Sequence, residues 1–338
     1  MHEAMLYEKL DDNKVRCDLC AHRCVIAAGR KGICLVRENR DGALYTLVYG
    51  RTISQHVDPV EKKPLFHFHP GTLAYSIATP GCNFRCTFCQ NWEISQMPRE
   101  QHLIMGTEAT PAEIVADARR TRCRSIAYTY TEPTIFFEYA YDTARLAHEQ
   151  GLGNLFITNG YETPEAVEMI RPYLDAANVD LKAFTKDFYR KMVGAKLQPV
   201  LDTLKLMKQL GIWIEVTTLI IPTLNDSEDE LRDIARFIRD ELDVDTPWHV
   251  SAFYPTYKLL DKPRTPPATL RRAREIGLEE GLHYVYEGNV YGSEGENTYC
   301  YQCGARLIHR RGFTIMENRI VDGHCPVCGA TVAGVGMG

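Results

Sequence analysis

Three cysteines that stand close together in the chain, Cys82, Cys86 and Cys89, have the residue type and spacing of metal ligands. They form a CxxxCxxC pattern in the stretch "GCNFRCTFCQNW", and an aromatic residue, Phe88, comes directly before the last cysteine. Thiolates bind zinc and iron-sulfur clusters, and structural zinc sites are nearly always closed by four protein ligands. The loop therefore predicts a metal centre to which it contributes one ligand fewer than a closed site needs.

A second group of cysteines lies near the start of the chain, in "CDLCAHRC" and "KGIC". Its members are Cys17, Cys20, Cys24 and Cys34, and His22 could replace one thiol as a ligand. Four thiolates suit a tetrahedral zinc ion, and they equally suit a closed 4Fe-4S cluster that relays electrons. The sequence leaves these two interpretations open.

A third group near the end of the chain consists of Cys300, Cys303, Cys325 and Cys328. They form two CxxC pairs, "CYQC" and "CPVC", each followed by a glycine. This is the spacing of the two facing knuckles of a zinc ribbon, so zinc is our first interpretation. A rubredoxin-like iron site and an auxiliary iron-sulfur cluster fit the same spacing. The remaining cysteine, Cys123, is expected to be an inert core residue.

The composition describes a folded chain that is not suited to coating an anionic polymer. Of the 338 residues 45% are apolar, and the formal net charge is -5. This acidic balance argues against nucleic acid or an anionic membrane as partners, and no apolar run approaches membrane-spanning length. The first thirty residues contain no secretory h-region, so we expect a cytoplasmic protein. In a reducing compartment, clustered thiols predict metal sites rather than disulfides.

Strand and helix patterns alternate from just before the CxxxCxxC loop to just before the C-terminal cysteine pairs. Short runs rich in β-branched and aromatic residues predict strands at residues 73–78, 125–130, 154–158, 178–181, 212–220, 248–253 and 283–286. Helical periodicity separates them at residues 111–120, 134–149, 164–173, 197–210, 226–242 and 267–280. In the fifth of these helices, Ser227 and Glu230 have the spacing of a capping box.

Six strand-helix units followed by one more strand predict a parallel sheet, because right-handed crossovers place each new strand beside the last. The count favours an open, partial (β/α)6 barrel of the TIM type, and a flat doubly wound sheet is the alternative. We expect residues 71–290 to form this barrel. Residues 1–70 would be a cysteine-rich extension, and residues 291–338 a zinc-ribbon-like module.

Unusual residues follow the predicted strands repeatedly, where barrels of this kind carry their chemistry. The cysteine triplet follows the first strand and Glu132 the second. The later strands end at Thr158 and Asn159, at Asp180 and Lys182, at Ile221, and at the stretch "FYP". Each stretch taken alone is ordinary turn chemistry. Their joint placement predicts one rim that carries a functional site.

The chain resembles the radical S-adenosylmethionine (AdoMet) superfamily. The resemblance rests on the CxxxCxxC loop after the first strand of a βα series. The stretches "YTYTEPT", "TNGY" and "VDLK", in that order, are similar to the pyruvate formate-lyase activating enzymes. The stretch "DPVEKKPLFHFHPGT" and the terminal cysteine pairs resemble one branch, the radical SAM enzymes of the AmmeMemoRadiSam system.

This resemblance accounts for the missing fourth cysteine. It implies that Cys82, Cys86 and Cys89 hold three irons of a 4Fe-4S cluster, and that AdoMet chelates the fourth iron through its amine and carboxylate. One-electron transfer to the bound AdoMet would then give methionine and a 5'-deoxyadenosyl radical. Phe88 would belong to the cofactor-binding loop.

The resemblance also assigns roles on the rim. Glu132 would accept a hydrogen bond from the AdoMet amino group, and Lys182 would face the AdoMet carboxylate. Thr158 and Asn159 would lie beside the ribose, and Ile221 would contact adenine.

Two positions depart from the pattern of the activating enzymes. Tyr130 and Thr131 stand where two glycines are usual, and Ile157 replaces an aspartate that helps to hold a monovalent cation. Because isoleucine cannot ligate a cation, that cation site is in doubt here even though Asp180 is present.

Two classes of function remain at this stage. The first is an enzyme that abstracts a hydrogen atom from a small molecule or from a protein substrate, such as the glycine of a partner protein, with electrons from ferredoxin or flavodoxin. The second is a non-catalytic iron-sulfur or zinc protein that transfers electrons or acts as a binding protein. Glu132 and Lys182 favour the first class, because an electron carrier needs neither.

Overall fold

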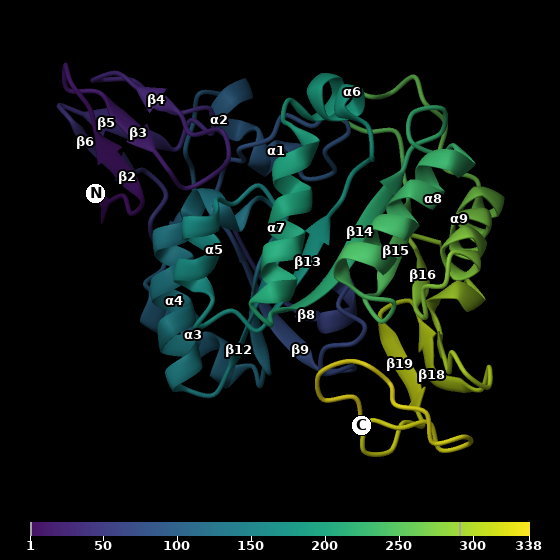
Figure 1. Ribbon diagram of the computed structural model, residues 1–338. Helices are drawn as coiled ribbons and strands as arrows, with labels where there is room; N and C mark the ends of the chain where they lie inside the picture. Colours follow the sequence, from purple (N-terminus) through teal and green to yellow (C-terminus); the bar gives the residue numbers. More distant parts are fainter. Residues whose placement is uncertain (1, 291) are drawn as a thin grey trace.

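A computed structural model describes residues 2–290 and 292–338, and its centre is an eight-stranded sheet (Figure 1). The strands of this sheet are β8 (Ser54–Pro59), β9 (Leu73–Ala78), β11 (Ser125–Tyr128), β12 (Gly153–Thr158), β13 (Ala176–Asp180), β14 (Trp213–Ile220), β15 (Trp248–Ala252) and β16 (Val285–Gly288). The strand order is β16-β15-β14-β13-β12-β11-β9-β8. All neighbours from β9 to β16 pair in parallel, and β8 pairs antiparallel with β9.

The parallel α/β arrangement predicted from the sequence is confirmed. The strand order follows the chain without the reversal that a doubly wound sheet has at its switch point. The antiparallel edge strand β8 was not predicted, because its residues "SQHVDP" lack the apolar character of the buried strands.

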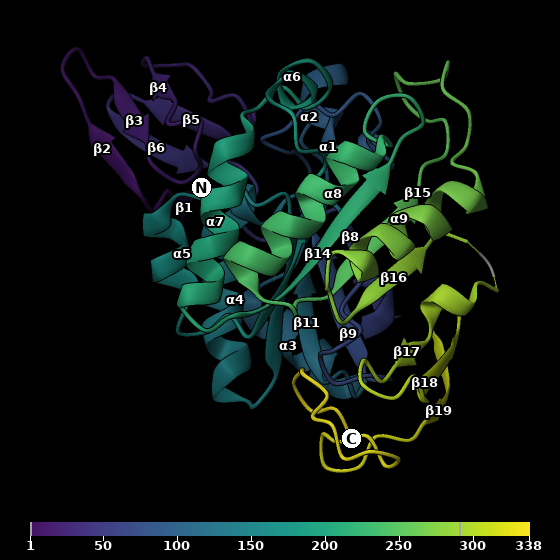
Figure 2. The same cartoon turned by 45° about the vertical axis from the view of Figure 1, so that its right-hand side comes forward.

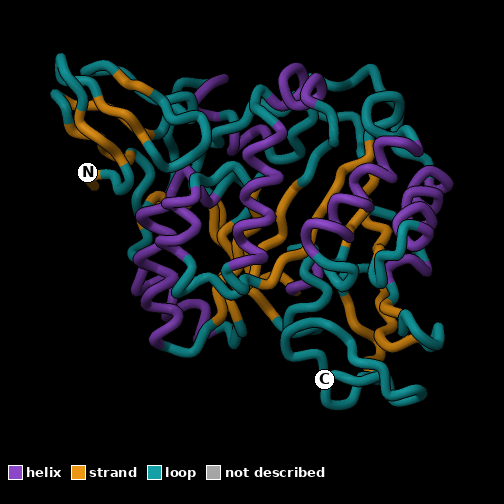
Figure 3. The backbone as a smooth tube through the Cα atoms, in the orientation of Figure 1, coloured by secondary structure: helices purple, strands orange, loops and turns teal. Residues whose placement is uncertain are grey.

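The helices lie along the outer side of the sheet, while the strands form the interior (Figures 2 and 3). The α-helices are α1 (Trp92–Ser95), α2 (Met97–Glu100), α3 (Pro111–Arg120), α4 (Phe137–Glu149), α5 (Pro164–Ile170), α6 (Lys186–Phe188), α7 (Leu197–Gln209), α8 (Glu228–Phe237) and α9 (Pro267–Glu279). Short 3-10 segments are η1 (Val60–Lys62), η2 (Pro133–Phe136) and η5 (Glu294–Glu296), and π-helical turns are η3 (Tyr189–Val193) and η4 (Ile238–Leu242). Among the described residues, no helix is long and apolar enough to cross a membrane.

Side-chain caps begin several of these helices. At α3, Thr110 and Glu113 form a complete capping box. At α8 the predicted capping box is only half formed: Ser227 accepts a hydrogen bond from the backbone of Glu230, but the Glu230 carboxylate accepts one from Phe184 N at 2.7 Å instead. Glu230 therefore joins α8 to the loop after β13 rather than closing its own helix.

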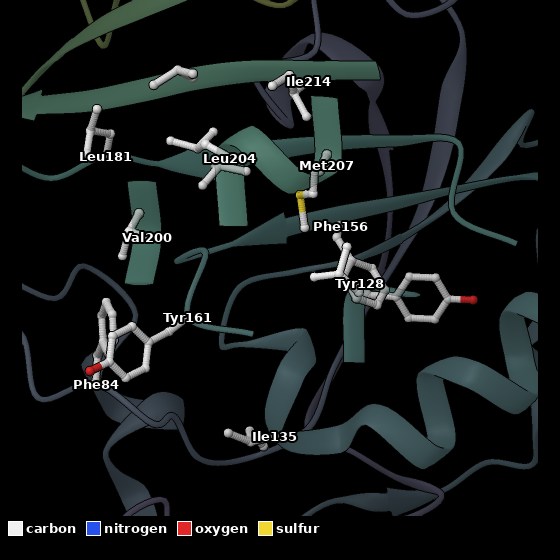
Figure 4. Close-up of a cluster of buried hydrophobic side chains, with 14 of the residues drawn as sticks. Phe84, Tyr128, Ile135, Phe156, Tyr161, Leu181, Val200, Leu204, Met207 and Ile214 are labelled. Atoms are coloured by element: carbon white, nitrogen blue, oxygen red, sulfur yellow. The ribbon is translucent and has the colours of Figure 1, made fainter. Parts of the chain in front are cut away.

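One large apolar core fills the space between the sheet and the helices. Figure 4 shows part of it, with Tyr128 from β11 and Phe156 from β12 close to Met207 from α7. Each such side chain contributes roughly 1.5 to 3 kcal/mol when it is fully buried. The rings of Phe84 and Tyr161, 5.0 Å apart between centroids, extend this core to the loops beyond the strand ends. The core therefore supports the end of the sheet at which the cysteine loop lies.

Small sheets occupy the two ends of the chain. Near the N-terminus these contain β1 (His2–Glu3), β5 (Arg37–Arg40) and β6 (Ala43–Thr46), and β2 (Tyr7–Lys9), β3 (Val15–Cys17) and β4 (Val25–Ile26). A two-stranded sheet joins β7 (Arg51–Thr52) to β10 (Thr107–Glu108). The C-terminal sheet contains β17 (Thr298–Tyr299), β18 (Arg306–Arg311) and β19 (Thr314–Asn318).

The C-terminal segment shares a core with the central sheet. Cys300 and Cys325 are buried in one cluster with Phe66, Tyr284 and Tyr286. Backbone hydrogen bonds continue the contact, from Val335 N to His67 O at 2.8 Å and from His69 N to Val335 O at 2.7 Å. The boundaries at residues 70 and 290 stay predictions, but this segment does not pack only on itself.

Candidate metal and cofactor site

A cavity of about 410 Å³ opens at the end of the sheet where the parallel strands finish. Most of the residues predicted to act at the rim line it together, although they are far apart in the sequence. These are Cys82, Cys86, Phe88, Cys89, Glu132, Thr158, Asn159, Asp180 and Lys182. The cavity thus brings the three thiols and the polar side chains of three strand ends into one place.

The conformation of the cysteine loop follows from its contacts. Gly81 has a φ of 111°, and a side chain there would place its Cβ 2.9 Å from Val36 Cγ1. This position therefore needs glycine. Beyond it, Arg85 N and Thr87 N donate to the carbonyls of Val193 and Met192, both at 2.9 Å. The loop is thereby fixed against the π-helical turn η3.

The three loop thiols do not form a compact set, and two of them have hydrogen-bond partners. Within residues 2–290 and 292–338, no three of them belong to a group whose ligand atoms all lie within 4.8 Å of one another. Phe84 N donates to Cys82 Sγ at 3.3 Å, and Cys89 Sγ lies 3.2 Å from Ser95 Oγ. Hydrogen bonds to the sulfurs are one means by which proteins tune iron-sulfur clusters. The donor set of three thiols beside an open cavity fits an iron-sulfur cluster with one free iron.

Glu132 is the best-anchored polar group of the cavity. It is 1% exposed, and its Oε1 accepts hydrogen bonds from Thr134 N, Thr134 Oγ1 and Thr158 Oγ1 at 3.1, 2.6 and 2.8 Å. Its Oε2 accepts from Asn159 N at 2.8 Å. Each carboxylate oxygen has two lone pairs, and Oε2 accepts one hydrogen bond, so Oε2 retains an acceptor position for a ligand.

A second buried carboxyl group, Glu162, lies behind Glu132. Thr158 Oγ1 is 2.8 Å from Glu132 Oε1 and 2.7 Å from Glu162 Oε1. One hydroxyl proton serves only one of these oxygens, so one carboxyl must be protonated to complete the chain. Burial and the nearby Glu162 raise the pKa of Glu132 to about 8, and burial also raises the pKa of Glu162.

Lys182 and Asp180 form an ion pair at the end of β13. Lys182 Nζ lies 2.7 Å from Asp180 Oδ2, and the Lys182 side chain is 14% exposed. Burial alone would lower the pKa of Lys182, but the Asp180 carboxylate outweighs it and raises that pKa. Lys182 therefore stays cationic, and Asp180 is its partner in this pair.

Ile221 differs from the other predicted rim residues. It is fully buried in the main core, where its N donates to Asn225 Oδ1 at 2.6 Å, and it is not among the residues that line the cavity. Leu219, which belongs to the preceding strand β14, lines the cavity and offers apolar contact in its place. The expected adenine contact by Ile221 stays a prediction.

Charged residues upstream of the cysteine loop also reach the cavity, and sequence reasoning assigned them no role. Lys63 is 1% exposed, pairs with Asp58 at 2.7 Å, and lies 4.3 Å from the centre of the Tyr130 ring. Burial lowers the pKa of Lys63 to about 8. The Tyr130 hydroxyl donates to Asp58 Oδ2. A run of charged residues such as Glu61 to Lys63 is typical of a solvent-exposed surface. Only the flanking residues Val60 and Pro64 indicated that part of this segment is buried.

Tyr130 occupies a backbone conformation that favours glycine. Its φ is 62°, which a residue with a side chain adopts at an energetic cost of roughly 1 kcal/mol or more. The position therefore has a backbone conformation that glycine adopts most easily, although a tyrosine stands there. The contacts of its ring and hydroxyl with Lys63 and Asp58 offset that cost.

The C-terminal cysteines form a compact ligand set. The Sγ atoms of Cys300, Cys303, Cys325 and Cys328 all lie within 4.8 Å of one another. Cys300 and Cys328 are 3.6 Å apart, and Cys303 and Cys325 are 3.7 Å apart. Around one zinc ion the sulfurs are about 3.8 Å apart, because Zn–S bonds of about 2.3 Å point to the corners of a tetrahedron. This spacing fits a single ion.

The four N-terminal cysteines line a pocket of their own, which is separate from the cavity of the CxxxCxxC loop.

Comparisons with known proteins agree with this geometry. The family model described as the Radical SAM superfamily matches residues 76–238. An uncharacterized protein of Methanocaldococcus jannaschii is 52% identical over 334 residues, which cover 98% of this chain and 99% of that protein. The pyruvate formate-lyase-activating enzyme of Clostridium pasteurianum is 26% identical over 171 residues, 49% of this chain and 69% of that enzyme.

Among solved structures, a radical SAM methyltransferase from Sphaerobacter thermophilus is similar in fold. The TM-score is 0.52 with 18% sequence identity, and the match covers 70% of this chain and 71% of that one. At this identity the likeness concerns the fold alone.

Proposed function

The chain belongs to the radical SAM superfamily of enzymes, and from this premise we propose that its cavity binds a 4Fe-4S cluster on Cys82, Cys86 and Cys89 together with AdoMet. The observation that carries the proposal is the convergence of Glu132 and Lys182 on the cavity that also holds these thiols. A carboxylate and an ammonium there match the amine and the carboxylate of an amino acid. We interpret the surrounding sheet as the partial (β/α)6 barrel expected from the sequence.

The chain's own residues bind and orient AdoMet. Glu132 accepts a hydrogen bond from the amino group through the free position on Oε2. Lys182 keeps Asp180 as a partner and directs another of its three N–H donors to the AdoMet carboxylate. Thr158 and Asn159 lie beside the ribose, and Phe88 and Leu219 supply apolar contacts. When bound, the cluster would supply one electron for the reductive cleavage of a carbon-sulfur bond of AdoMet, which would give methionine and a 5'-deoxyadenosyl radical.

A substrate would then lose a hydrogen atom to this radical, and we propose the glycine of a partner protein as the leading substrate class. The similarity to a pyruvate formate-lyase-activating enzyme supports this proposal. Ferredoxin or flavodoxin would donate the electron. We propose zinc for the C-terminal cysteines, because their sulfurs have the spacing of one tetrahedral ion.

AdoMet cleavage by anaerobically purified protein tests this function. With a strong reductant, the wild type should form 5'-deoxyadenosine and methionine slowly without substrate, as chromatography will measure. Lys182→Ala should weaken AdoMet binding about ten- to a hundred-fold, since it removes a hydrogen bond between charged groups. Lys191→Ala, an exposed lysine outside the cavity, is the control and should bind AdoMet normally. If iron-loaded wild type forms no 5'-deoxyadenosine, even with its natural partners, the chain is an electron carrier instead.

A further inference from the structure

The four N-terminal cysteines surround one buried pocket, and they are spaced differently from the C-terminal four. Cys17, Cys20, Cys24 and Cys34 all line this pocket, with apolar residues such as Leu19 and Ile135 around them. Within the described part of the chain, the C-terminal set is the only group of three or more potential ligands whose atoms all lie within 4.8 Å. Any three of the N-terminal thiols therefore include a pair that is further apart.

This difference in spacing separates the two kinds of centre that the sequence left open. The thiolates around a single zinc ion are about 3.8 Å apart, as in the C-terminal set. A 4Fe-4S cluster places its four irons at alternate corners of a cube, so its thiolates stand further apart. The three thiols of the CxxxCxxC loop, which also hold irons in the proposed function, likewise include a pair more than 4.8 Å apart. The N-terminal four thus match the cluster sites rather than the single-ion site.

A buried arginine provides a second, independent sign of an anionic occupant. Arg37 lines the pocket and is 2% exposed. Its Nη2 donates to Glu138 Oε1 and to Met5 O, but Nε and Nη1 have no hydrogen-bond partner among the described residues. An unsatisfied buried donor costs about 1 to 3 kcal/mol. Thiolates and the sulfides of a cluster would accept these hydrogen bonds and place negative charge beside the guanidinium.

The pocket lies directly against the CxxxCxxC loop. His22 Nε2 is 3.0 Å from the carbonyl oxygen of Asn83, the residue after Cys82, and Asn83 itself lines the pocket. Arg99 of α2 donates to Ile33 O at 3.0 Å. Figure 1 shows the N-terminal segment (purple) beside α1 and α2, which follow that loop. A centre in this pocket would therefore be the neighbour of the open cluster.

We propose that Cys17, Cys20, Cys24 and Cys34 hold a second, closed 4Fe-4S cluster that passes single electrons to the cluster of the CxxxCxxC loop. The relay rests on the proposed function. A reduced ferredoxin or flavodoxin loses one electron, and the closed cluster gains it, passing from the 2+ to the 1+ state. The closed cluster returns to the 2+ state when the open cluster takes the electron. No bond forms or breaks in this transfer.

Iron content and spectra test the site without any activity. Wild type should hold about eight irons, and the variant with Cys82, Cys86 and Cys89 changed to Ala about four, since its N-terminal thiols are native. After reduction, that variant should give an electron paramagnetic resonance signal that AdoMet does not change. Cys20→Ser with Cys24→Ser should also leave about four irons, and the lone buried Cys123→Ser should leave about eight. If the loop variant holds no iron and wild type holds two zinc ions, the proposal is wrong.

Electron delivery tests the relay separately. With dithionite, which reduces the open cluster directly, the Cys20→Ser/Cys24→Ser protein should form 5'-deoxyadenosine within about twofold of wild type. With reduced flavodoxin, its rate should fall at least tenfold. If the double variant forms 5'-deoxyadenosine as fast as wild type with both donors, the relay is wrong. If wild type forms no 5'-deoxyadenosine with either donor, the proposed function is wrong, but the iron content of the N-terminal site still tests the second cluster.

The variant Arg37→Lys tests the position of the cluster. It keeps every thiol and should lower the midpoint potential of the electron paramagnetic resonance signal of the N-terminal cluster. An unchanged potential would contradict a cluster beside Arg37.

Discussion

Glu132 combines two requirements that oppose each other. In the proposed function Glu132 accepts a hydrogen bond from the AdoMet amine, while its burial beside Glu162 raises its pKa to about 8. In the ligand-free protein it is therefore mostly protonated at neutral pH. An amino group binds the ionised carboxylate more strongly, so AdoMet binding should release this proton.

The pH dependence of AdoMet binding follows from this shift. As pH rises from 6 to about 8, the wild-type affinity should increase by up to about tenfold per unit, because less free energy is needed to deprotonate Glu132. Glu132→Gln cannot ionise and should lack this component. The ratio of the two affinities, measured by equilibrium dialysis of iron-loaded protein, should grow with pH and then level off. A ratio that stays constant between pH 6 and 8 would contradict the role of Glu132.

At the scale of elements, the strand ends were predictable and the segment before the first parallel strand was not. Buried parallel strands are continuous apolar runs, so β9 to β16 and the polar residues after them stand out in the sequence. The residues after four of these strands do meet at the cavity. Lys63 was not predicted to be buried because its burial depends on Tyr130, which is distant in the sequence and stands where the resemblance implies a glycine. The Glu230 contact with Phe184 escaped for the same reason, since tertiary partners displaced a local cap.

Tyr130 joins the segment containing Asp58 to the loop after β11, and its hydroxyl should contribute to stability. Tyr130→Phe removes one donor to a buried carboxylate that keeps Lys63 as a partner, so we expect a loss of about 1 to 2 kcal/mol in the free energy of unfolding. Tyr254→Phe is the matched control, because the Tyr254 hydroxyl donates to Asn289 O at an exposed site. Urea denaturation of anaerobic protein measures both. Equal losses would show that the hydroxyl of Tyr130 holds nothing together.

At the scale of the whole molecule, the three cysteine groups sit around one continuous fold. The N-terminal pocket adjoins the CxxxCxxC loop, and the C-terminal core contains Phe66 from the segment between β8 and β9 and Tyr286 from β16. Phe313, beyond β18, even lines the cavity. Sequence patterns located each group, but they could not show these contacts, because apolar residues such as Phe66 look alike whichever surface they cover. Loss of the metal at one cysteine group should therefore destabilise the part of the fold that packs against that group.

The C-terminal site provides the test of this connection. Cys303→Ser with Cys328→Ser removes two exposed ligands and should release about one metal ion per chain while the iron content stays unchanged. Without the ion, the C-terminal core loosens, and the backbone hydrogen bonds of His69 and Val335 should open more often. Hydrogen exchange at these two amides should accelerate, whereas exchange in β12 should not.

Val327→Ser serves as the control for this experiment. The side chain lies between the two cysteines of the second pair, is exposed, and ligates nothing. This variant should keep its metal and its exchange rates. Metal loss in the double variant with unchanged exchange at His69 and Val335 would mean that the site stabilises only its own loops. Faster exchange at both amides would show that the segment before β9 is stabilised in part by a metal ion bound more than 200 residues away in the sequence. The reason would be that the shared apolar cluster of Phe66, Tyr284 and Cys325 depends on that ion.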